Sequence, residues 1–152
     1  MTLSGEKQLL GKKLTEGAFT FDLYEAKADW TAGTKLSTAV NDAEGCFTFP
    51  VLTFDTPGTW QYLVKEANGG KVVQDVLYDD TVYRVTVTVT KNDEGELAYL
   101  VELANGDALT FRNRYVDQPP KTEDPALTLW ITLMTLTGGA AITLMAKKKK
   151  LF

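Results

Sequence analysis

The chain has 152 residues, a formal net charge of −4, one cysteine and no histidine. This length allows one domain with a hydrophobic core plus a tail. The missing histidine excludes Ser-His-Asp and Cys-His catalysis and histidine-ligated metal sites, and the lone Cys46 excludes an internal disulfide.

The charge is unevenly distributed. Residues 1–118 hold 11 Lys/Arg against 18 Asp/Glu, whereas residues 119–152 hold 5 against 2. An acidic N-terminal part has no basic face to neutralise phosphates, so we expect no nucleic-acid partner.

Residues 1–116 have the patterns of strands and turns. Alternating apolar residues are separated by Gly, Asn and Asp turn signals, and no segment has a convincing helical period, residues 34–40 being too short. This spacing favours an all-β, Greek-key, immunoglobulin-like β-sandwich. Asp79 and Asp80 are interpreted as solvated turn residues. The expected strands cover residues 3–9, 18–24, 47–49, 58–66, 72–77, 82–90, 97–103 and 109–115.

The remaining residues indicate a membrane anchor. Residues 117–125 form a polar, proline-rich linker, and residues 126–146 carry no charge. A helix of that length spans about 31 Å, close to a bilayer's hydrocarbon core, and a buried soluble helix would need a polar face. We therefore expect a transmembrane helix at 126–146, a cytoplasmic basic tail at 147–152 and an extracellular β domain. Because Met1 lies almost on the first strand, with no signal-peptide pattern, we expect either that the chain is the terminal part of a longer product or that its true start lies upstream.

Three polar residues fall in the apolar phase of their strands: Lys7, Glu66 and Asn113. Successive strand side chains alternate faces, so all three are expected to point inward. A lone lysine in this phase can instead extend its ammonium to solvent. Together, a buried amine, carboxyl and carboxamide are a reactive set that can join Lys7 to Asn113 through an amide bond. The apolar residues in the same phase are Leu3 and Leu9, then Trp60, Tyr62 and Val64, and finally Leu109, Phe111 and Tyr115.

Six segments, taken in order, resemble the pilin isopeptide-linkage domains of Gram-positive surface proteins, which include the streptococcal pilins. The resemblance covers residues 4–115 and implies a CnaB-like sandwich. It also implies an isopeptide bond between Lys7 and Asn113, with Glu66 as the catalytic proton shuttle. The matching segments are GEKQLLGKKL (5–14), GAFTFDL (17–23), NDAEGCFTF (41–49), GTWQYLVKE (58–66), YDDTVYRVTV (78–87) and LTFRNRY (109–115).

The chemistry that this resemblance implies depends on burial. Desolvation favours the neutral amine of Lys7 and the protonated carboxyl of Glu66. Protonated Glu66 then polarises the Asn113 carbonyl and transfers protons while Nζ attacks and ammonia leaves. Such a single-turnover reaction makes the chain self-crosslinking rather than an enzyme, and it needs no cofactor or metal.

The tail resembles a sorting signal of the Leu-Pro-x-Thr-Gly class, which sortase cleaves after the threonine. In this chain the window is Pro119-Pro120-Lys121-Thr122-Glu123, with proline in place of leucine and Glu123 in place of glycine. Thr122 is the candidate acyl site for attachment to peptidoglycan or to another pilin subunit. Because Glu123 replaces the glycine beside the scissile bond, the alternative is that the protein stays membrane-anchored.

These features predict a cell-surface structural module, the stalk or base domain of a pilin-like or adhesin-like protein. Its expected partners are the membrane, sortase, and peptidoglycan or other pilin subunits. The alternative is a ligand-binding β-sandwich that recognises a host protein or glycan. In that case Trp30, expected in an exposed loop over residues 26–34, is the candidate contact residue, unless it covers one end of the sandwich.

Overall fold

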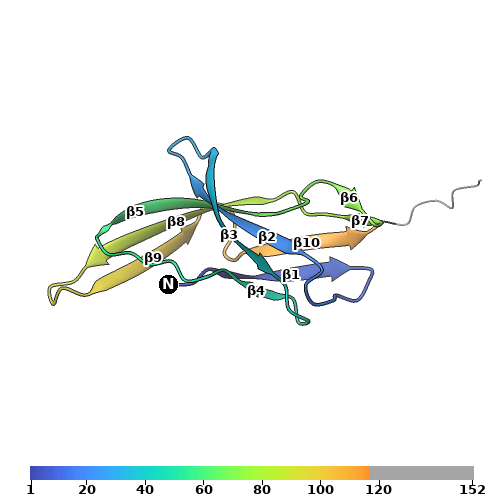
Figure 1. Cartoon of the computed structure of the whole chain (residues 1–152), viewed down its shortest axis with the longest axis horizontal. Helices are drawn as coiled ribbons and strands as arrows, with labels where there is room; N and C mark the ends of the chain where they lie inside the picture. Colours follow the sequence, from blue (N-terminus) through green and yellow to red (C-terminus); the bar gives the residue numbers. More distant parts are fainter. Residues whose placement is uncertain (117–152) are drawn as a thin grey trace, which may run out of the picture. The chain divides into compact units, whose positions relative to one another are not determined.

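The computed structural model describes residues 1–116, which form ten strands and no helix. They build two five-stranded sheets, one in the order β4-β1-β10-β7-β6 and the other in the order β3-β2-β5-β8-β9 (Figure 1). The all-β, two-sheet prediction is confirmed. The strands are β1 (Ser4–Leu10), β2 (Thr20–Ala26), β3 (Ala32–Val40), β4 (Cys46–Thr48), β5 (Gly58–Glu66), β6 (Val72–Val73), β7 (Val76–Leu77), β8 (Val82–Lys91), β9 (Leu97–Leu103) and β10 (Thr110–Tyr115).

The predicted linker, transmembrane helix and basic tail lie outside the described residues. Within residues 1–116, no helix has the length and apolar character needed to cross a bilayer.

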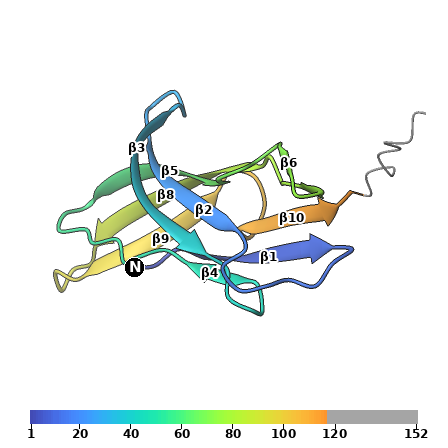
Figure 2. The ribbon, with the colours of Figure 1, turned by 45° about the vertical axis from the view of Figure 1, so that its right-hand side comes forward.

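The first and last strands lie side by side, although the chain between them passes through both sheets. β1 and β10 run parallel, as both ribbon views show (Figures 1 and 2). In this pair Lys7 lies opposite Phe111 and Leu9 lies opposite Asn113. Lys7 and Asn113 are therefore offset by two residues across this pair. Since the side-chain period of a strand is two, they share one face of the sheet.

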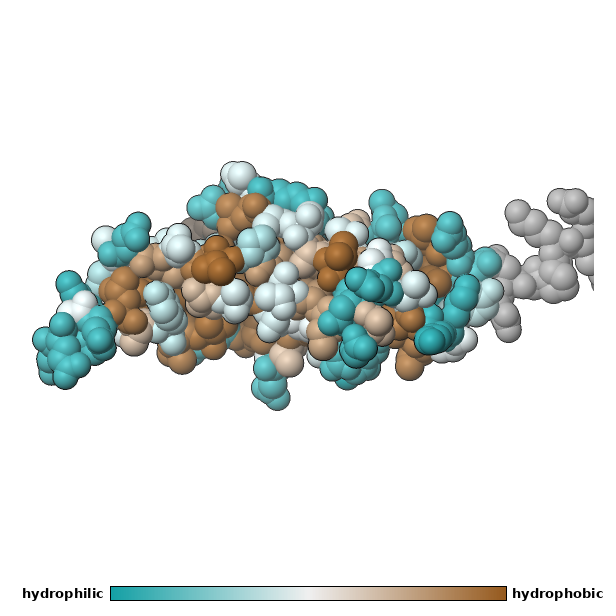
Figure 3. All heavy atoms as spheres, turned by 60° about the horizontal axis from the view of Figure 1, so that its bottom comes forward, coloured by the Kyte–Doolittle hydropathy of each residue, from teal (hydrophilic) through white to brown (hydrophobic). Residues whose placement is uncertain are grey.

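The hydrophobic core fills the space between the sheets. Its centre is aromatic: the rings of Phe21 and Phe47 stack with centroids 3.9 Å apart, and Phe111 lies 5.2 Å from Phe21. Valines of β8 and β5, among them Val64 and Val85, are fully buried beside them. On the face seen in Figure 3, apolar and polar side chains are interspersed, as is ordinary for a folded domain.

β3 is a long strand that the sequence pattern did not predict. It is an edge strand whose side chains are mostly exposed or half-buried, and only Ala39 is buried. Its pairing with β2 also shifts register around Tyr24. A strand with little burial on either face lacks the alternation by which strands are recognised.

The segment 72–77, predicted as one strand, is a hairpin. β6 and β7 pair through Val73 and Val76, and the intervening Gln74 and Asp75 both have positive φ. Positive φ at both central residues is the geometry of a type I′ turn. The turn lets β7 pair with β10 next to Asn113, since Leu77 lies opposite Arg114.

Candidate functional site

The fold brings Lys7, Glu66 and Asn113 together in the interior. Their relative exposures are 1%, 1% and 0%. Lys7 and Asn113 come from the neighbouring strands β1 and β10, and Glu66 comes from the end of β5 in the opposite sheet. The set is thus assembled only where the two sheets face each other.

One carboxylate oxygen contacts both nitrogens. Lys7 Nζ lies 2.8 Å from Glu66 Oε1, and Asn113 Nδ2 donates a hydrogen bond of 2.9 Å to the same atom. Within residues 1–116, neither Nζ nor Glu66 Oε2 has a partner at hydrogen-bonding angles, so the 2.8 Å contact is close but poorly aligned. Buried polar atoms are rarely left unsatisfied. Residues 1–116 contain three such side-chain atoms, of which Nζ and Glu66 Oε2 belong to the reacting pair and the third is Asp22 Oδ1.

The carbonyl oxygen of Asn113 is bound by the backbone rather than by Glu66. Asn113 Oδ1 accepts a hydrogen bond of 2.7 Å from the N–H of Asp79. The family resemblance implies instead that Glu66 polarises this carbonyl, whereas Glu66 contacts the amide nitrogen. Asp79 is half-buried, so its interpretation as a solvated turn residue is wrong, while Asp80 is exposed. The one sequence feature that pointed to a role for Asp79 was its place beside Tyr78 in a segment that resembles the pilin family.

Aromatic rings enclose the amine. Nζ lies 4.6 Å from the centroid of the Phe19 ring and 5.9 Å from that of Phe21. Tyr78 packs edge-on against Phe19 at 5.3 Å. These rings keep water away from the amine, and removing water disfavours the charged forms of both Lys7 and Glu66.

The electrostatics of the pair follow from this enclosure. Burial lowers the pKa of Lys7 from its ordinary 10.5, although contacts with Glu66 oppose the shift. Burial raises the pKa of Glu66 from its ordinary 4.5, against the opposing effects of Lys7 and Asn113. Both directions favour a neutral amine beside a protonated acid, the forms required for attack on an amide.

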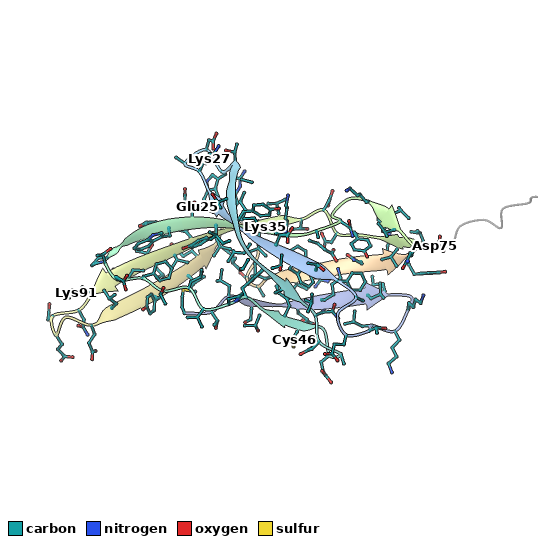
Figure 4. All side chains as sticks on the ribbon, viewed as in Figure 1. Glu25, Lys27, Lys35, Cys46, Asp75 and Lys91 are labelled. Carbon is teal, nitrogen blue, oxygen red and sulfur yellow. The ribbon has the colours of Figure 1, made fainter. Side chains whose placement is uncertain are left out.

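A second lysine–carboxylate pair provides an internal comparison. Lys35 Nζ lies 2.7 Å from Asp22 Oδ1, but the Lys35 side chain is 45% exposed and extends from β3 (Figure 4). The hydrogen bond to Asp22 raises the pKa of Lys35, so this amine stays charged and unreactive. Contact distance alone therefore does not distinguish the two pairs; solvent exposure does.

The other predicted residues are placed as follows. Trp30 is half-buried rather than exposed, in a shorter turn over residues 27–31, and the Arg84 guanidinium lies 5.4 Å from its ring centroid. Cys46 is exposed and unpaired (Figure 4). Thr122 lies outside the described residues. Within residues 1–116, no cluster of His, Cys, Asp and Glu has the arrangement of a metal site.

Comparison with known proteins identifies a family and similar folds. The family model FctA, described as a Spy0128-like isopeptide containing domain, matches residues 3–116. A mutant of the major pilin from Streptococcus pyogenes is similar in structure, with 21% identity, a TM-score of 0.50 and coverage of 76% of this chain and 50% of that one. A second major pilin from the same species shares 16% identity, with a TM-score of 0.50 and coverage of 75% and 52%.

The chain thus spans about half the length of the solved pilins that it matches. No curated protein matches the sequence. Because the family model covers most of the chain and the whole of its β-sandwich, the chain belongs to the Spy0128-like isopeptide-containing domain family.

Proposed function

We propose that the chain is a load-bearing surface module, the stalk or base domain of a pilin-like or adhesin-like protein, strengthened by a Lys7–Asn113 isopeptide bond. One observation carries this proposal: Glu66 Oε1 lies within 2.9 Å of both the attacking and the leaving nitrogen. The family match and the pilin fold support it.

The bond forms in one displacement at the Asn113 side chain. Neutral Nζ attacks Cγ, and the C–Nδ2 bond breaks. Glu66 donates its proton to Nδ2 and takes one from Nζ, so that ammonia leaves and the carboxyl is regenerated. The product contains neither a buried amine nor a buried ion pair. The unsatisfied Nζ therefore becomes an ordinary amide N–H.

The bond matters because of where it lies. It closes a loop of about 100 residues, which on the chain-entropy model stabilises the fold by roughly 4–5 kcal/mol. β1 and β10 are parallel, so a pull on the two ends of the domain shears this strand pair. A covalent bond between the two strands transmits that force directly.

An attachment at the C-terminal end is the second part of the proposal. Residues 126–146 hold the protein in the membrane and residues 147–152 lie in the cytoplasm. Thr122 is the position at which sortase would transfer the chain to peptidoglycan or to another pilin subunit.

The crosslink is tested by intact mass spectrometry of the purified full chain. We expect a mass lower than that of the sequence by one ammonia, and the full sequence mass in the Glu66→Ala and Lys7→Ala variants. Lys35→Ala, which removes the exposed lysine of the comparison pair, should still lose one ammonia. A folded wild-type chain with the full sequence mass would contradict the proposal.

Attachment is tested separately, with a signal peptide added and the chain expressed in a sortase-bearing Gram-positive host. Since glycine beside the scissile bond is the expected residue, Glu123→Gly should shift the protein from the membrane to the cell-wall fraction. Adding Thr122→Ala should reverse this shift. Equal distribution of all three chains would argue against sorting at this position.

The ligand-binding alternative receives less support, because the candidate contact residue Trp30 packs on the chain's own Arg84. A ligand-binding function would therefore need a surface that does not include Trp30.

A further inference from the structure

We propose that the loop at Asp79 is the oxyanion site of the crosslinking reaction, with the Asp79 N–H as the donor and the Asp79 carboxylate as the group that positions it. This inference rests on the proposed self-crosslinking and extends it. It assigns a role to a residue outside the Lys7, Glu66 and Asn113 set.

The donor lies where charge develops. When Nζ attacks Cγ, negative charge moves onto Asn113 Oδ1, and the Asp79 N–H lies 2.7 Å from that atom. Oxyanion sites place their donors 2.7–3.1 Å from the position that the oxyanion occupies, and the contact to the unreacted carbonyl oxygen already aims this N–H at that oxygen. Glu66 is bound at the nitrogen of the same carboxamide, so proton transfer and charge stabilisation are performed by different groups.

The carboxylate of Asp79 fixes the loop to the strand that carries the electrophile. Its Oδ2 accepts a hydrogen bond of 2.7 Å from the N–H of Arg112, the residue before Asn113. Its Oδ1 accepts bonds of 2.9 and 2.5 Å from the N–H and Oγ1 of Thr81. One residue thus contacts both the side chain of Asn113 and the backbone next to it. At Asp79 the loop between β7 and β8 belongs to neither sheet. The hydrogen bonds of the Asp79 carboxylate therefore set the distance of this loop from β10.

The charge of Asp79 is compatible with this role. Burial alone would raise its pKa, but the hydrogen bonds from Arg112 and Thr81 outweigh burial and lower it. The carboxylate thus stays ionised, with its charge directed at three donors rather than at Oδ1. Its negative field contributes to the raised pKa of Glu66, which favours the protonated acid, and it partly opposes the burial that lowers the pKa of Lys7.

The test measures the rate of ammonia loss in the full chain. Uncrosslinked chain is recovered in denaturant and folded in detergent at low pH, where protonation of Lys7 blocks the reaction. A shift to neutral pH then starts the reaction. Aliquots are then followed by intact mass. Asp79→Ala should react roughly 10–100-fold more slowly than wild type, because the loop no longer holds the donor in place. Asp80→Ala removes an exposed neighbour whose side chain makes no hydrogen bond within residues 1–116, and it should react at the wild-type rate.

Two further measurements separate positioning from folding. The first measurement compares the free energy of unfolding of the Lys7→Ala chain with that of the Lys7→Ala/Asp79→Ala chain. Neither chain can crosslink, so denaturant unfolding reports the stability of the uncrosslinked fold. If the Lys7→Ala/Asp79→Ala chain is unfolded, the Tyr78–Asp79 peptide bond is replaced by an ester. The ester keeps every side chain and removes only the N–H, and it should slow the reaction roughly 100–1000-fold, as the loss of one oxyanion donor does.

The outcomes distinguish this inference from the proposed function. If the wild-type chain never loses ammonia, self-crosslinking itself fails. If wild type crosslinks and a folded Asp79→Ala chain, or the ester chain, reacts at the same rate, the oxyanion role is overturned while the crosslink stands. Slower crosslinking in the folded Asp79→Ala chain, or in the ester chain where Asp79→Ala is unfolded, together with an unchanged Asp80→Ala rate, supports the role.

Discussion

Pulled from its two ends, the domain is expected to show no extension from the chain between Lys7 and Asn113. Tension enters at residue 1, crosses from β1 to β10 through the isopeptide bond and leaves at residue 116. In Lys7→Ala the bond is absent, so unfolding releases the intervening chain of about 106 residues. At 3.3–3.6 Å per residue this amounts to an added contour length of roughly 350–380 Å.

Single-molecule force spectroscopy measures this difference, with handles at Met1 and in the linker 117–125. Lys35→Ala is the matched control, since it removes a lysine that also contacts a carboxylate yet leaves the wild-type response intact. A wild-type chain that extends as far as Lys7→Ala would mean that no covalent bond joins the two strands.

The rate of crosslinking is expected to have a bell-shaped dependence on pH. The reactive state holds one proton on the Lys7–Glu66 pair, as a neutral amine beside a protonated acid. At low pH the pair holds two protons and the amine is blocked, so the rate rises as pH increases. At high pH the last proton leaves, no acid remains for the departing nitrogen, and the rate falls. Since both groups interact, the two limbs report the pair rather than either residue.

The directions of the pKa shifts locate this window. The pKa of Lys7 lies below 10.5 and that of Glu66 above 4.5, in both cases because of burial. The optimum therefore falls between these values. The nearest other titratable groups do not change charge there: hydrogen bonds lower the pKa of Asp79 from 3.8, and burial raises that of Tyr78 from 10.0.

The measurement is a pH jump of folded, unreacted full chain, followed by intact mass at intervals. Outside the optimum the rate should fall about tenfold per pH unit on each side, as for single-proton titrations. Tyr78→Phe should leave both limbs in place. A rate that climbs steadily to the pKa of free lysine would mean that Glu66 does not act as an acid.

The buried faces of the strands were predictable because their signal is local. In β1, β5 and β10 the period of two places Lys7, Glu66 and Asn113 in phase with apolar neighbours, and all three are buried. The strand predictions were wrong where this alternation is weak. β3 has little burial on either face. The hairpin of β6 and β7 depends on positive φ at Gln74 and Asp75, and these residue types do not predict such a turn as glycine would.

The sequence by itself determined the all-β class and the inward direction of Lys7, Glu66 and Asn113, because alternation depends only on the geometry of each strand. It did not single out Asp22 and Asn41, which are also buried. The tertiary structure decided what those side chains meet. The parallel register of β1 and β10 offsets Lys7 from Asn113 by two residues, and the opposite sheet supplies Glu66. The N–H of Asp79, a loop residue, binds the Asn113 carbonyl oxygen, for which the family resemblance implies Glu66. A backbone donor is present at every residue except proline, so only the folded chain reveals which one faces the reacting atoms.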